Sequence, residues 1–302
     1  MRDRLRMGRT LADSQSEISL LVVAAALLRS SCDHVFVTLL VTLYTSRGIV
    51  FAADSAITID SRGSRSRRPK QEKFLTTKRV GMNGGVIGYF GLAQVRSEPM
   101  DKWLRRALDR WHGSASVAKL GVYLRDELNR SVPKAERTHN PSGFHIGAFE
   151  SRDGSAVPVL QYVSNIQSLD VQTGAYSGFV EYSSGEHFPR HPSGKGPCQN
   201  VAPSQMRSSL RDFERTQGIP VWFRNGQLAF AARTWDALML AIGDITADLR
   251  RAGFSLPDDL AKWEELADTL VRTNGRLYAL LSTRGAPGIE GPYRKTSIPW
   301  PS

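Results

Sequence analysis

The chain has 302 residues, of which 41% are hydrophobic and 23% charged, a balance typical of a globular protein and not of a disordered or fibrous one. Its two cysteines, Cys32 and Cys198, are too few for a disulfide framework or a cysteine-based metal site, and we expect a cytoplasmic protein. The formal net charge of +11 raises the question of an acidic partner, so the position of the basic residues matters.

The first 37 residues differ from the rest of the chain. Several arginines precede an apolar run at residues 18–28, which is too short to span a bilayer. A signal peptide has the same order of segments, but no small-residue cleavage site follows this run. We therefore expect no membrane segment, and we expect residues 1–37 to be absent from the mature protein, either as a propeptide or because the start is misassigned.

Two strands are predicted directly after this segment. Residues 37–43 and 49–53 are apolar and β-branched, and the Ser-Arg-Gly sequence at 46–48 is a turn signal. In a hairpin centred near the first residue of that turn, Thr38 lies opposite Asp54, and a change of one residue in the loop shifts the pairing by one position. Local rules therefore place a threonine and a carboxylate side by side.

Many of the basic residues gather between Arg62 and Arg79. This stretch holds eight lysines and arginines and one glutamate, so it contributes +7 to the net charge. It contains a single aromatic residue and no recognisable nucleic-acid-binding motif. We interpret it as a solvated basic loop and not as a nucleic-acid site.

The rest of the chain alternates between blocks of strands and blocks of helices. The strands are predicted at 73–77, 86–91, 143–149 and 157–163, and the helices at 97–111, 116–130, 234–252 and 257–273. This order predicts an α+β fold in which two sheets lie between layers of helices.

The stretch from Thr38 to Gly91 resembles the start of a proteasome β-type subunit. Members of that family begin at a nucleophilic threonine, run through an apolar strand to a glycine, and reach an Ala-Ala-Asp-Ser segment. Here these features are Thr38, Gly48 and residues 52–55, and the interval of sixteen residues from threonine to aspartate matches the family without a gap. A lysine before an apolar strand and a glycine after the next strand are the following family elements, which Lys73 and Gly91 provide.

The resemblance implies a single domain of the N-terminal-nucleophile (Ntn) hydrolase type over residues 38–302. The implied fold is α+β, a four-layer αββα sandwich of two antiparallel sheets. The insertion-rich segment at 164–233 departs from the family, because it has no clear counterpart there. The implied activity is that of a threonine-type peptidase or amidohydrolase that cleaves peptide or other amide bonds without a cofactor or metal. A homo-oligomer is also implied, and a partner ATPase is left open.

The residue types suit this chemistry. A free N-terminal threonine provides a hydroxyl nucleophile and an α-amine that takes up its proton, and a lysine ammonium nearby lowers the pKa of both groups. The resemblance therefore implies catalytic roles for Thr38 as nucleophile, Asp54 as the residue that orients the lysine, and Lys73 as activator. Gly91 is the expected oxyanion donor, because the backbone of a glycine can approach a substrate closely. Lys70 fits the family interval by ungapped counting, but we favour Lys73 because it precedes an apolar strand.

Two further departures from the family pattern keep other functions open. Val37 stands where self-processing members have glycine, and residues 288–291 stand where an Asp-x-x-Ser-Gly-Gly element is expected. The alternatives are a narrower small-molecule amidase and a catalytically inactive scaffold that holds an acidic partner with its basic 62–79 loop. A GUG start codon at position 37 would yield Met before Thr38, and removal of that methionine would free the threonine amine. We therefore expect the natural protein to begin at Thr38.

Overall fold

The computed structural model describes the chain in several stretches. They are residues 39–54, 72–139, 141–166, 168–169, 176–177, 181–187, 201–226, 229–255, 257–281 and 293–302. Thr38, Lys70, both cysteines, residues 1–37, most of the basic stretch and residues 288–291 lie outside the described residues.

The first sheet is built around the hairpin of β1 (Leu39–Thr45) and β2 (Gly48–Ala53). Its two outer strands are β12 (Val221–Gly226), beside β1, and β13 (Arg294–Pro299), beside β2, and all pairs are antiparallel. β1 and β2 are buried along their whole length, because both faces of this sheet are covered.

The register of the hairpin differs by one position from our expectation. Asp54 lies opposite Leu39 and not opposite Thr38, because the loop has two residues, 46–47, and its centre is half a residue further along the chain than we assumed. Successive residues of a strand face opposite sides, so a shift of one position changes which residue meets the aspartate. The carboxylate therefore lies beside the residue that follows the threonine.

The second sheet has five antiparallel strands in the order β11-β8-β7-β4-β3. Their bounds are β3 (Phe74–Thr77), β4 (Gly85–Phe90), β7 (Gly143–Arg152), β8 (Ser155–Ser164) and β11 (Ser183–His187). Two short pairs lie apart from the sheets, namely β5 (Gln94–Val95) with β6 (Glu98–Pro99), and β9 (Ser168–Leu169) with β10 (Tyr176–Ser177).

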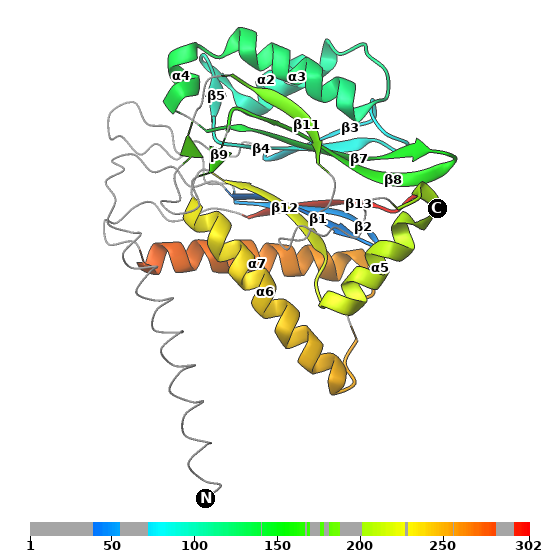
Figure 1. Ribbon diagram of the computed structural model, residues 1–302. Coiled ribbons are helices and arrows are strands. Elements are labelled where there is room, and N and C mark those ends of the chain that lie inside the picture. Colours follow the sequence, from blue (N-terminus) through cyan, green and yellow to red (C-terminus); the bar gives the residue numbers. More distant parts are fainter. Residues whose placement is uncertain are drawn as a thin grey trace, which may run out of the picture.

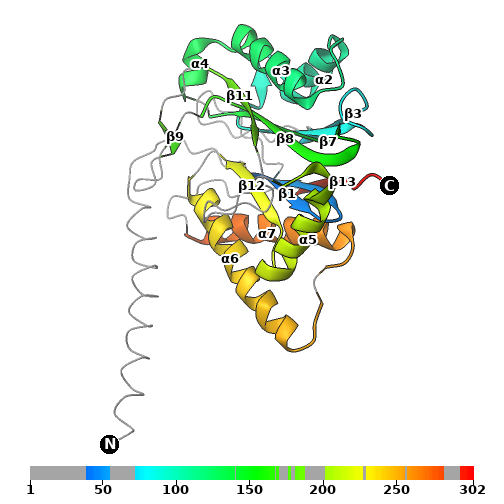
Figure 2. The same ribbon diagram turned by 45° about the vertical axis from the view of Figure 1, so that its right-hand side comes forward.

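Helices cover the outer face of each sheet (Figure 1). The helices are α2 (Met100–Asp109), α3 (Val117–Ser131), α4 (Lys134–His139), α5 (Met206–Gln217), α6 (Ala229–Arg251) and α7 (Leu260–Leu281), with a 3-10 turn at Pro203–Gln205. α3 contacts β7, β8 and β11, whereas α7 contacts β1, β2 and β13. The rotated view in Figure 2 keeps the two sheets adjacent, with α2 and α3 on one side and α5, α6 and α7 on the other.

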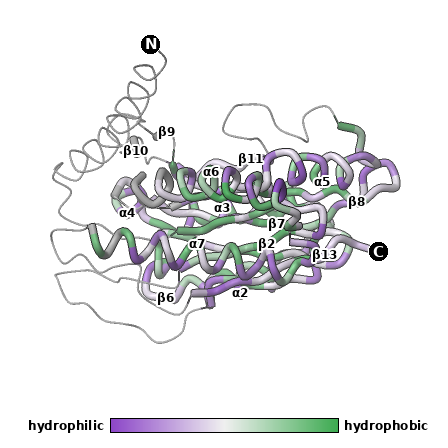
Figure 3. The backbone as a smooth tube through the Cα atoms, turned by 90° about the horizontal axis from the view of Figure 1, so that it is seen from below, coloured by the Kyte–Doolittle hydropathy of each residue, from purple (hydrophilic) through white to green (hydrophobic). Residues whose placement is uncertain are grey.

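The two sheets pack directly on one another. The ring of Phe51 occupies the place that a side chain at Gly147 would take, 2.4 Å from an added Cβ. In the same way, the side chain of Leu40 lies 2.8 Å from a Cβ added at Gly88. Small residues on one sheet thus accept large side chains from the other. Figure 3 shows the resulting pattern, with hydrophobic stretches in the strands and alternating hydrophobic and hydrophilic stretches along the helices.

Several predicted element ends require correction. The helix expected from residue 97 begins at Met100, because Pro99 disfavours helical backbone at the residue before it and Glu98–Pro99 form a strand instead. The last two helices are longer than expected, since α6 begins at Ala229 and α7 runs to Leu281. Within the described helices, none is both long and apolar enough to cross a membrane.

Candidate functional site

Asp54 immediately follows β2 and is completely buried. Its Oδ1 accepts a hydrogen bond from the backbone N–H of Leu39 at 3.0 Å, and its own N–H donates to the Leu39 carbonyl at 3.3 Å. Among the described residues, the second carboxylate oxygen, Oδ2, has no hydrogen-bond partner. The carboxylate therefore fixes the backbone directly after Thr38 and keeps one oxygen atom buried beside it.

Lys73 lies just before β3 and is only 2% exposed. Its Nζ is 4.9 Å from the centre of the Tyr89 ring, a distance at which the ring face attracts a cation. Burial raises the pKa of the Asp54 carboxyl and lowers the pKa of the Lys73 ammonium, and the attraction between the two charges opposes both shifts. Each charge therefore helps to keep the other ionised in a buried place.

Gly91 follows β4 with a φ of +81°, which lies in the left-handed region. A Cβ at this position would be 2.1 Å from the carbonyl oxygen of Pro141 and 2.5 Å from the Cβ of Ser142. Both the backbone conformation and the available space therefore require glycine. The backbone at Gly91 is held against the segment that leads into β7.

A buried polar network holds that segment in place. The backbone N–H of Ser142 donates to Asn165 Oδ1 at 2.7 Å, and the Asn165 amide donates to the carbonyl of Arg137 at 2.9 Å. The hydroxyls of Ser142 and Tyr182 are 2.7 Å apart. Sequence reasoning missed these residues, because single Ser, Asn and Tyr residues at these distances along the chain have no motif that marks them.

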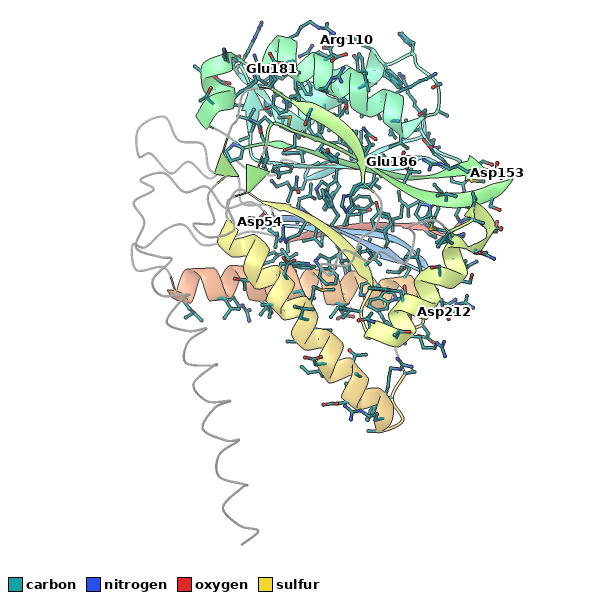
Figure 4. All side chains as sticks on the ribbon, viewed as in Figure 1. Asp54, Arg110, Asp153, Glu181, Glu186 and Asp212 are labelled. Carbon is teal, nitrogen blue, oxygen red and sulfur yellow. The ribbon has the colours of Figure 1, made fainter. Side chains whose placement is uncertain are left out.

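Hydrophobic contacts bring the ends of β1, β2 and β4 together. Leu40, Ala53 and Phe90 form a small buried cluster, and Ile166 packs against it. These residues neighbour Leu39, Asp54, Gly91 and Asn165 in sequence. Figure 4 shows Asp54 at the end of the sheets where this cluster forms.

His145 forms a second buried polar group between the sheets. Its Nδ1 is 2.9 Å from the Thr42 hydroxyl, and its ring packs against Phe90 and Phe223 with centroids 6.2 and 4.7 Å away. Burial lowers the pKa of His145 to about 3, and His187 adds to the effect. The imidazole is therefore neutral near pH 7. The sequence offered no signal for it, because its partner hydroxyl lies on a distant strand.

The structure brings two of the expected site residues together. Asp54 and Lys73 are both buried and near enough for their opposite charges to attract, and Gly91 follows the strand that packs on the same end of the hairpin. The expected nucleophile, Thr38, and the alternative lysine, Lys70, lie outside the described residues. In the described part of the chain, no three His, Cys, Asp or Glu residues are grouped so that they could hold a metal ion.

The buried carboxylate of Asp54 and the buried ammonium of Lys73, near the start of β1, are therefore the main evidence from which a function can be inferred. Comparisons of the chain with models of protein families, with curated proteins and with solved structures give no match.

Proposed function

We propose that the chain is a threonine-type Ntn hydrolase that cleaves peptide or other amide bonds. The observation that carries this proposal is the buried pair of Asp54 and Lys73 beside the backbone that follows Thr38. Burying two charges in this way costs several kcal/mol per ion before their attraction repays it, roughly as much as the whole stability of a small domain. A buried carboxyl and a buried lysine whose pKa values are both shifted by burial are typical of catalytic sites.

The proposed fold is the four-layer αββα sandwich of the proteasome β-type family. Two antiparallel sheets that pack face to face support it, as do the helices that cover their outer faces (Figure 1). The central hairpin of β1 and β2 supports it further, because it carries the aspartate at the position that the family spacing gives.

In the proposed reaction, the Thr38 hydroxyl oxygen attacks the carbonyl carbon of the amide, and its proton passes to the α-amine of the same residue. The amine then gives this proton to the departing nitrogen, so the C–N bond breaks and an ester joins the acyl group to Thr38. Water attacks the ester next, with the same amine as base, and the acid product leaves. The Lys73 ammonium favours the attacking oxyanion form, and Asp54 holds that ammonium in place.

The proposed oxyanion donor is the backbone N–H of Gly91. Its left-handed conformation and tight contact with the 141–142 segment fix the direction of the peptide group. Preorganised donors of this kind stabilise a developing negative charge by about 3 kcal/mol. The network of Ser142, Asn165 and Tyr182 supports that geometry from behind.

The alternative of a scaffold that binds an acidic partner through the basic stretch receives less support. Lys73 is buried, and the guanidinium of Arg79 donates to the carbonyl oxygens of Leu108, Asp109 and Trp111 at the end of α2. The first of these cations therefore lies in the protein interior, and the second binds the C-terminal end of α2, so neither contributes to an open basic surface.

The test is hydrolysis of fluorogenic peptide amides and of small amides by protein whose first residue is Thr38. Thr38→Ala should lower kcat/KM by about 10³-fold or more, whereas Thr38→Ser keeps a hydroxyl and an amine and should retain measurable activity. Hydrolysis of small amides but not peptides would identify the narrower amidase. Unchanged activity of a purified Thr38→Ala variant would contradict the proposal.

A second comparison assigns the activating lysine. Lys73→Ala should reduce activity nearly as much as loss of the nucleophile, and Lys70→Ala should have a much smaller effect, because the activating charge must lie within about 4–6 Å of the hydroxyl. An inactive Lys70→Ala variant together with an active Lys73→Ala variant would reverse the assignment.

A further inference from the structure

A cavity of about 440 Å³, the α2–α3 cavity, opens between the β5–β6 hairpin, α2 and α3. It lies apart from the hydrolase site, since Figure 4 shows Arg110 beyond the second sheet, next to α3, and Asp54 on the other side of that sheet. Four arginines and two glutamates line it, so its charged residues carry an excess of two positive charges. They are Arg96, Arg106, Arg110, Arg130, Glu98 and Glu127.

The two glutamates hold three of the arginines in place. Glu127 is 6% exposed, and its two oxygens accept from Arg110 at 3.1 Å and from Arg130 at 2.9 Å. Both oxygens of Glu98 accept from Arg106 Nε at 3.2 Å. A guanidinium has five N–H donors, and these contacts occupy one on Arg110 and one on Arg130. The arginines are therefore positioned by carboxylates and still have N–H groups for another acceptor.

Arg96 lies in a backbone conformation that does not suit arginine. It is the first residue of the two-residue loop between β5 and β6, and its φ is +54°. Glycine is favoured at that position of such a loop, and a residue with a side chain there costs about 1 kcal/mol. Its Nε donates to the carbonyl of Ser131, the last residue of α3, at 3.1 Å. The arginine side chain must therefore contribute something that the turn does not need.

We propose that this cavity binds the phosphate group of a small, soluble phosphorylated molecule. A phosphomonoester carries nearly two negative charges near pH 7, which matches the excess of two positive charges. Guanidinium groups pair with phosphate oxygens through two parallel hydrogen bonds, which favours arginine over lysine in such sites. The volume lies within the range of small-molecule sites and leaves room for an organic group beside the phosphate.

A purely structural role for these arginines makes a different prediction about Arg96. If the side chain serves only to tie the hairpin to α3, then Arg96→Gly should lower the unfolding temperature. If it serves a ligand, Arg96→Gly should leave the unfolding temperature unchanged or raise it, because the turn is relieved, while phosphate binding is lost.

The experiment is calorimetric titration of the full chain with inorganic phosphate at pH 8, with chloride keeping the ionic strength constant. We expect saturable binding at one site, weakened at least tenfold by Arg96→Gly and by Arg130→Gln. Arg251→Gln is the matched control, because Arg251 is an exposed arginine on α6 with a carboxylate partner of its own, and it should keep the wild-type affinity. Glycerol phosphate should compete with inorganic phosphate.

Three results would overturn the proposal. They are the absence of saturable phosphate binding to the wild-type chain, equal binding by Arg96→Gly, and equal weakening by Arg251→Gln. Binding to vesicles that contain phosphatidic acid, without binding of free phosphate or glycerol phosphate, would point to a lipid surface and reject the soluble ligand. The proposal does not depend on hydrolase activity, so these outcomes are independent of the Thr38 experiments.

Discussion

Two groups of charged residues in this molecule differ in their contact with water. Asp54 and Lys73 are 0% and 2% exposed, whereas the arginine side chains that pair with glutamates around the α2–α3 cavity are 48–69% exposed. Loss of one partner in the buried pair leaves a charge without water or counter-charge, which is strongly destabilising. Loss of Arg106, by contrast, leaves Glu98 as a charge that water solvates. Stability alone does not explain why the chain buries Asp54 and Lys73, whereas the proposed catalysis does explain it.

The largest expected effect comes from breaking the buried pair. Lys73→Met should lower the free energy of unfolding by about 3–5 kcal/mol, because Asp54 is left as a buried charge without its partner. The measurement is urea unfolding at pH 8, because alkaline pH disfavours protonation of the unpaired carboxylate, which would otherwise remove the buried charge.

A double variant separates stability from activity. Asp54→Asn with Lys73→Met removes both charges and keeps an oxygen that can accept from Leu39, so most of the lost stability should return. The double variant should remain inactive toward amides. Failure to recover stability would mean that the charges are not coupled as the structure places them.

Gly91→Ala should have the next largest effect, with a loss of about 3 kcal/mol in the free energy of unfolding. The alanine would adopt a left-handed backbone conformation and would collide with the Pro141 carbonyl and Ser142. Gly154→Ala is the matched control, because Gly154 has a φ of +73° but nothing within 4 Å of an added Cβ. It should cost only about 1 kcal/mol. Equal losses in the two variants would contradict the close approach at Gly91.

Acid should weaken the fold through His145. Burial keeps its pKa at about 3 in the folded protein, below the usual 6.5, so the unfolded chain binds the extra proton between these pH values. The stability from the neutral imidazole is complete above about pH 6.5 and falls as the pH drops toward 3. At pH 4.5 the loss should be about 2–3 kcal/mol relative to pH 8.

The measurement is the difference in unfolding free energy between the wild type and His145→Gln at pH 8 and pH 4.5. The wild type should lose more stability than this variant, and His112→Gln, at an exposed histidine, should behave as the wild type does. Parallel pH profiles for all three proteins would show that His145 is not held neutral by burial.

The smallest effect is expected at the exposed ion pairs. Arg106→Gln removes the partner of Glu98 but should change the free energy of unfolding by less than about 1 kcal/mol, because both side chains are solvated. The effect should shrink further in 1 M salt. A loss as large as that of Lys73→Met would remove the contrast between the two groups of charges.

The parts of the fold that local signals encode were predictable. The hairpin of β1 and β2, the strands β3 and β4, and α3 follow from apolar runs, turn residues and the spacing of apolar residues, and the structure confirms them. The strands β12 and β13 were missed. β13 reads Arg-Lys-Thr-Ser-Ile-Pro, a polar sequence that becomes a strand because β2, far away in the chain, offers it a free edge.

The same limit applies to the site. Asp54 could be proposed because its distance from Thr38 fits the family pattern, Lys73 because it precedes an apolar strand, and Gly91 because it ends one. Asn165, Tyr182 and His145 could not, since each is joined to its partner only by the packing of elements that are distant in sequence. The arginines around the α2–α3 cavity share no motif, and only the meeting of a hairpin with two helices brings them together.

The most direct test of the central claim is the mass of the peptide that contains Thr38 after treatment with an electrophilic β-lactone. Protein that begins at Thr38 should gain one acyl group on the threonine oxygen, because ring opening joins the lactone carbonyl to the nucleophile as an ester. Lys73→Ala should acylate far more slowly, and Thr38→Ala should gain nothing at this position. An adduct elsewhere in the chain that inhibits amide hydrolysis, with Thr38 unmodified, would contradict the account.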